Sequence, residues 1–98
     1  MLATIIWSFI AGLFGGNAFP HFVKGITHEC YPNVFGGSPV SNFLAGWFGF
    51  LTTAGLVYLA HPGLHPLASF TAAAVGVLVM GLFHAGHGAF GRTPERKE

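Results

Sequence analysis

The chain has 98 residues, of which 52% are hydrophobic and only 7% are Asp, Glu, Lys or Arg, and its net charge is +1 with His neutral. A soluble domain of this size normally carries charge on about a quarter of its residues. No charged side chain precedes Lys24, and the 62 residues between Glu29 and Arg92 contain none. A chain with so little charge cannot cover itself with polar surface, so we expect lipid to surround most of it.

The same composition excludes several classes of protein. No basic run is interleaved with aromatic residues, so we expect no nucleic-acid partner. Cys30 is the single cysteine, which excludes a disulfide scaffold. The sequence contains no phosphate-binding glycine loop, zinc-protease motif or nucleophile elbow, and we therefore expect a protein that is not an enzyme.

Three segments are long and apolar enough to cross a membrane as helices, which takes about 20 residues. They cover residues 2–21, 39–60 and 66–89. Ser38 and Pro39 predict the start of the second span, as an N-cap residue followed by proline at the first helical position. The short turn of residues 61–65 predicts that the last two spans form an antiparallel hairpin. The sequence thus predicts an all-α integral membrane protein with a single membrane domain.

The segments outside the spans differ in character. Residues 22–38, the connection between the first two spans, mix polar and apolar side chains, which suits a segment at the level of the lipid headgroups. Residues 90–98 form a charged tail. The first span has an alternative interpretation as a cleavable signal peptide, because residues 16–18 resemble a small-residue cleavage site. Signal peptides carry positive charge before their apolar region, and nothing before Lys24 supplies it, so we expect this span to be retained.

The basic residues indicate an orientation. Three spans place the first connection and the C-terminal tail on one side of the membrane. Lys24 falls in the connection, while Arg92, Arg96 and Lys97 fall in the tail, so all four share that side. Bacterial topology rules place the basic side in the cytoplasm. We predict an inner-membrane protein with its N-terminus outside and its C-terminus in the cytoplasm.

Small residues four positions apart mark faces on which membrane helices approach closely. The pairs are Gly12 with Gly16, Ala45 with Gly49, Ala72 with Gly76, and Gly81 with Ala85. These faces either pack the three helices together, or one of them meets another membrane subunit or a second copy of the chain.

Polar side chains gather at one expected depth, near the cytoplasmic ends of the spans. They are Asn17, His21, Asn42, His84 and His87. His84 lies between Gly81 and Gly88 on one helix face, which predicts that it points between helices. His21 is nine residues beyond Gly12, on the opposite face of an ideal helix, so these two residues are not expected to face one neighbour.

Three interpretations of this polar cluster remain open. Its members either hydrogen-bond across helices and fix the packing, or they line a proton or solute path in a small oligomeric transporter, or they bind a metal, haem or pigment. The transporter is disfavoured because the spans contain no Asp, Glu, Lys or Arg to couple an ion. The metal candidates are His84, His87 and His21, joined by His28, Glu29 or Cys30. No particular cofactor follows from the sequence.

One stretch resembles a known family. Asn17-Ala-Phe-Pro-His-Phe-Val-Lys-Gly, then Tyr31-Pro32, then Ser38-Pro-Val-Ser-Asn-Phe-Leu44, is similar to the core of a family of short bacterial multi-pass membrane proteins without an established activity. The chain departs from that core at His28, where the resemblance implies a small residue, and in a shortened link before Ser38. The resemblance singles out Asn17, Pro20, His21, Pro39 and Asn42. The leading hypothesis is a non-catalytic structural or accessory component of a membrane complex.

Overall fold

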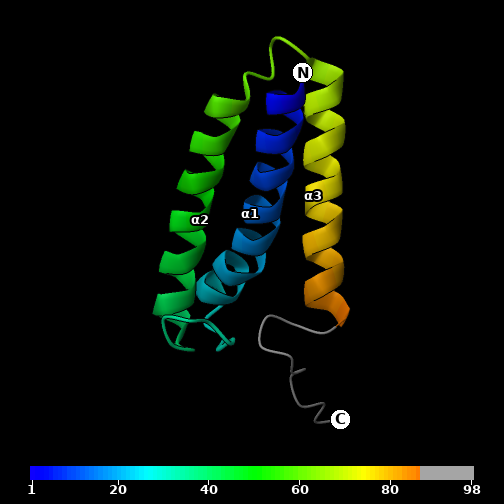
Figure 1. Cartoon of the computed structure of the whole chain (residues 1–98). Coiled ribbons are helices and arrows are strands. Elements are labelled where there is room, and N and C mark those ends of the chain that lie inside the picture. Colours follow the sequence, from blue (N-terminus) through cyan, green and yellow to red (C-terminus); the bar gives the residue numbers. More distant parts are fainter. Residues whose placement is uncertain (87–98) are drawn as a thin grey trace.

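A computed structural model describes residues 1–86 of the chain. These residues form three helices, α1 (Leu2–Ile26), α2 (Pro39–Ala60) and α3 (Pro66–Gly86), shown in Figure 1. Each helix is long and apolar enough to cross a membrane. The protein is therefore an all-α, three-helix membrane protein, as predicted.

The start of α2 follows the predicted capping pattern. Ser38 has an extended backbone, and its Oγ accepts a hydrogen bond of 3.1 Å from the backbone N–H of Ser41. Pro39 occupies the first helical position, where its missing N–H removes no helical hydrogen bond. The helix then runs to Ala60, and His61 ends it in the left-handed conformation with φ of 50°.

Helix α1 is longer than the predicted first span. It continues past His21 to Ile26, so residues 22–26, which the sequence assigned to the connection, are helical. Residues 22–25 are half-buried, and Phe22 and Gly25 pack against α2. The ring of Phe22 lies 5.4 Å from that of Phe43 and 5.2 Å from that of Phe50, centroid to centroid. This packing stabilises an additional helical turn that the local sequence alone does not require.

The C-terminus of α1 closes with a double hydrogen bond. The N–H of His28 donates to the carbonyl of Gly25 at 3.1 Å, and the N–H of Glu29 donates to that of Lys24 at 2.8 Å. This pattern is the Schellman motif, whose turning residue has positive φ and is usually glycine. Here that residue is His28, with φ of 64°. His28 therefore carries a side chain at a position that normally favours glycine.

Helix α1 lies between the other two helices (Figure 1). Helices α2 and α3 run in opposite directions across the turn of residues 61–65, as predicted for a hairpin, but each makes its extensive contacts with α1. Gly12 and His21 lie on opposite faces of α1, and each face has its own neighbour. Gly12 contacts α3, and His21 bonds Asn42 of α2.

Helices α1 and α3 meet closely at two glycines. A Cβ added to Gly12 would collide with the backbone carbonyl of Ala73, and one added to Gly76 would collide with that of Phe9. Gly16 also contributes, since its Cβ would lie 3.1 Å from Cβ of Met80. Nearer the start of both helices, the hydroxyls of Ser8 and Ser69 share a buried hydrogen bond of 2.6 Å. Glycine is required here because the two backbones touch.

Helices α1 and α2 meet toward the other end of α1. A Cβ on Gly46 would lie 2.6 Å from Phe22, one on Gly49 would lie 2.5 Å from Cβ of Ala18, and one on Gly25 would collide with Phe43. The predicted faces of Gly12 with Gly16 and of Gly49 are thus helix contacts within the chain, whereas Ala45 is half-buried.

At two other glycines, an added Cβ would contact no other described residue. Gly81 and Ala85 are exposed, and a Cβ on Gly81 would have no atom within 4 Å among the described residues. Gly55 on α2 is equally open. Within residues 1–86, Gly81 and Ala85 therefore line an open pocket beside α1 and are not at a close helix contact.

Candidate functional site

The predicted polar cluster centres on a buried pair. Nδ1 of His21, on α1, lies 2.7 Å from Oδ1 of Asn42, near the start of α2. Asn42 is fully buried at 0% exposure, and His21 is 6% exposed. Sequence analysis placed these two residues at one depth, and the structure brings them into direct contact.

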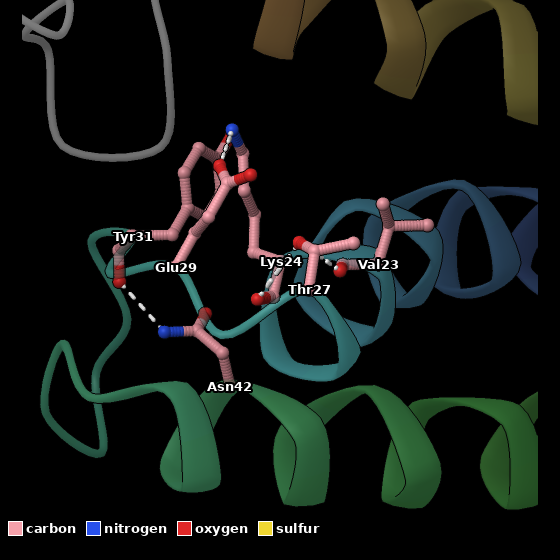
Figure 2. A network of polar contacts seen from close by, with 6 residues as sticks. All are labelled: Val23, Lys24, Thr27, Glu29, Tyr31 and Asn42. Atoms are coloured by element: carbon pink, nitrogen blue, oxygen red, sulfur yellow. Dashed lines mark hydrogen bonds and ion pairs between the residues drawn. The ribbon is translucent and has the colours of Figure 1, made fainter.

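The connection between α1 and α2 completes the surroundings of Asn42. Its Nδ2 donates to the carbonyls of Tyr31 at 2.9 Å and Ser38 at 3.0 Å; Figure 2 shows the bond to Tyr31. The N–H of Tyr31 donates in turn to the carbonyl of Gly37 at 3.1 Å. Asn42 therefore joins α1, α2 and the connection through one amide group.

These partners determine which nitrogen of the His21 ring carries the hydrogen. Because Nδ2 of Asn42 donates to two carbonyls, the atom facing His21 is the amide oxygen, which only accepts. Nδ1 of His21 must then carry the proton. In the neutral ring, Nε2 of His21 is left as a free acceptor.

His84 of α3 lies beside His21. The ring centroids are 6.2 Å apart, and the rings are nearly perpendicular at 79°. Nδ1 of His84 donates to the carbonyl of Met80 at 2.9 Å, so its Nε2 is also an acceptor in the neutral form. That Nε2 is buried and has no partner among residues 1–86. The site thus contains two neighbouring imidazoles whose Nε2 atoms both carry lone pairs.

The structure brings together two of the three metal candidates, His21 and His84. No three His, Cys, Asp or Glu side chains lie close enough to hold a metal ion within the described part of the chain. His28 and Cys30 are exposed, and Glu29 forms an ion pair of 2.9 Å with Lys24. His87, the remaining metal candidate, lies outside the described residues.

The ion pair at the connection is visible in Figure 2. Its hydrogen bond and the positive charge of Lys24 hold the pKa of Glu29 below its ordinary value. The hydroxyl of Thr27 donates to the carbonyl of Val23 at 2.8 Å and so caps the same turn. These contacts order the segment that follows α1.

Asn17 lies one turn before His21 on α1 but makes no contact with Asn42. Both Asn17 and His21 line a pocket of about 270 Å³ between α1 and α2, and residues 32–35 of the connection line it too. Asn33 is a pocket residue that sequence analysis missed, and its Nδ2 donates to the carbonyl of Ser41 at 3.2 Å. Its position in the connection, beside Tyr31-Pro32, was the available signal.

Sequence analysis also missed the polar pairs at the opposite end of the bundle. Besides the Ser8–Ser69 bond, the hydroxyl of Thr4 donates to the carbonyl of Ala60 at 2.8 Å, and both side chains are buried. Ser8 and Ser69 are polar residues in apolar spans, and matching their depths along the helices would have paired them. Thr4 bonds a backbone carbonyl, which no residue type marks in the sequence.

The fold and the cluster define an all-α integral membrane protein whose first helix is tied to the second by a buried His–Asn pair. Comparison of the chain with protein-family models, with curated proteins and with solved structures finds no match.

Proposed function

We propose that the protein is a non-catalytic structural or accessory component of a larger complex in the bacterial inner membrane. The observation that carries this proposal is a pair of glycines, Gly55 on α2 and Gly81 on α3, at which an added Cβ would have no atom within 4 Å among the described residues. Glycine in a helix costs about 0.5–1 kcal/mol relative to alanine. At Gly12 and Gly76 a backbone contact explains that cost, whereas no contact among residues 1–86 explains it at Gly55 or Gly81.

Helix association in membranes depends on close approach, because lipid is as apolar as the side chains themselves. Helices α2 and α3 both pack on α1 and leave most of their own surface free; the buried residues of α3 are Ser69, Ala72 and Gly76. An uncovered glycine on each of these two helices would let the backbone of a neighbouring membrane helix approach closely.

The proposal includes the orientation expected from the basic residues. Lys24 lies near the end of α1, at the end of the bundle where α3 also finishes. The positive-inside rule places this end in the cytoplasm and the turn of residues 61–65 outside. Retention of α1 is part of the proposal, since both other helices pack against it.

Crosslinking in native membranes, followed by purification and identification of captured neighbours, tests the accessory role. Gly55→Leu and Gly81→Leu place a side chain where an added Cβ meets no other described atom, so we expect the bundle to stay intact and a neighbour that the wild type captures to be lost. Val57→Leu and Val79→Leu enlarge exposed side chains on the same helices and serve as matched controls. A wild-type protein that runs as a monomer and captures no neighbour would contradict the proposal.

A further inference from the structure

The pocket between α1 and α2 combines polar and aromatic groups at one end of the membrane domain. Its volume is about 270 Å³, and its walls include Phe14, Asn17, His21, Asn33, Phe48 and Thr52. His21 is only 6% exposed, so its ring is held inside the protein rather than on its surface. The wall of the pocket therefore includes a buried polar side chain that is held in a fixed position.

The polar groups of the wall have defined hydrogen-bonding roles. Nδ1 of His21 is committed to Asn42, so Nε2 is the nitrogen that remains to accept a hydrogen bond. Asn17 takes no part in the bonds that tie Asn42 in place, and its amide remains to donate and to accept. Asn17 and His21 are four residues apart on α1, which puts them on one face about 6 Å apart along the helix.

The remaining walls restrict the charge and shape of a ligand. None of the described residues that line the pocket is Asp, Glu, Lys or Arg, so a charged ligand would enter without a counter-ion. Phe14 and Phe48 supply aromatic surface on which a flat ring packs well. A ligand of this pocket is thus neutral, flat and equipped with at least one hydroxyl donor for His21.

We propose that this pocket binds a neutral hydroxylated ring of the hydroquinone type. One ring hydroxyl donates to Nε2 of His21, and the oxygen on the opposite side of the ring bonds the amide of Asn17. Two oxygens across a six-membered ring are separated by a distance comparable with one helical turn, which matches the spacing of the two side chains. The proposal concerns binding and is independent of the accessory role.

The experiment compares decylubiquinol with decylubiquinone, kept in their respective redox states, for binding to the purified protein in lipid nanodiscs. The two molecules share a skeleton, but only the quinol offers a hydroxyl proton to His21. We expect the quinol to bind about tenfold more tightly, the ratio that corresponds to one net hydrogen bond. Equal affinity for the two, or no binding of either, would overturn the proposal.

Two variants test the location without removing the His21–Asn42 bond. Asn17→Ala deletes the second polar contact and should weaken quinol binding about tenfold. Ala45→Leu places bulk in the pocket wall and should abolish binding. Gly55→Leu lies outside the lining residues and is the control, with unchanged binding expected. Quinol affinity that is the same in all three variants would contradict this site.

A spectroscopic signature separates ligand contact from a purely structural role of His21. In protein with ¹⁵N-labelled histidine, the Nε2 resonance of His21 should shift on adding decylubiquinol, while Nδ1 stays protonated. Dioleoylglycerol, a lipid with one hydroxyl and no ring, is the competing probe. If it displaces the quinol and binds more tightly, the pocket belongs to a lipid and the ring proposal fails.

Discussion

His21 and Asn42 form a hydrogen bond of 2.7 Å between α1 and α2, in a position where both side chains are buried. The same asparagine holds the carbonyls of Tyr31 and Ser38. One amide on α2 thus satisfies three partners, His21 of α1 and two carbonyls of the connection, and so joins three segments. Because buried polar groups without partners are costly, removal of this amide affects all three segments together.

Asn42→Ala should lower the free energy of unfolding by about 1–3 kcal/mol, since it leaves buried polar groups unpaired. Reversible unfolding in mixed detergent micelles measures the change. Asn17→Ala is the matched control: the same substitution on α1, at a half-buried residue outside the Asn42 hydrogen bonds, should cost less than about 0.5 kcal/mol. Equal losses of unfolding free energy in the two variants would show that the hydrogen bonds of Asn42 add no stability beyond that of an ordinary half-buried residue.

Gly76→Ala should separate α1 from α3, because the added methyl group collides with the backbone of Phe9. Overpacking of this kind costs about 1–3 kcal/mol. Gly81→Ala on the same helix meets open space and should be neutral or slightly stabilising, since alanine is the better helix former. Thermal unfolding of both variants in detergent provides the comparison, and a destabilised Gly81→Ala with an unaffected Gly76→Ala would refute the observed contact.

His28→Gly should stabilise the protein by about 0.5–1 kcal/mol, because glycine adopts the positive φ at the end of α1 without strain. His28→Ala removes the same ring but keeps a Cβ, so little gain is expected. Unfolding free energies of the two variants test the backbone argument. A gain of equal size in both would attribute the effect to the imidazole instead.

The Lys24–Glu29 pair predicts a pH dependence. Lys24 lowers the pKa of Glu29 in the folded protein, so the pair stabilises the fold above the ordinary glutamate pKa. This contribution is lost as the pH falls through the lowered folded pKa. Carboxyl ¹³C titration should show the depressed pKa, and Lys24→Met should return it toward the ordinary value. The Thr27 side chain also lowers the pKa of Glu29, but by less than Lys24 does. Thr27→Ala should therefore shift this pKa less than Lys24→Met.

The spans and the depth of the polar cluster were predictable because both depend on counting along the chain. Apolar runs identify helices, Ser38 and Pro39 identify the start of α2, and a constant rise per residue puts His21 and Asn42 at one level. These features require no knowledge of which helix lies beside which.

The neighbours of each helix could not be predicted in the same way. The short turn after Ala60 indicates that α2 and α3 are antiparallel, yet α1 lies between them. Small-residue spacing marks Gly12 and Gly81 equally, but within residues 1–86 an added Cβ collides with another helix at Gly12 and meets nothing at Gly81. Which of these faces is used depends on the rotation of the whole helix, and many distant contacts determine that rotation together.

The central place of α1 has a consequence for assembly during synthesis. Of the three helices, α1 is synthesised first and is the one on which both later helices pack, so we expect each of them to find its packing partner already made. A fragment of residues 39–86 lacks that template. Coexpressed with residues 1–38, it should regain its packing, which makes the chain a natural case for complementation between two halves.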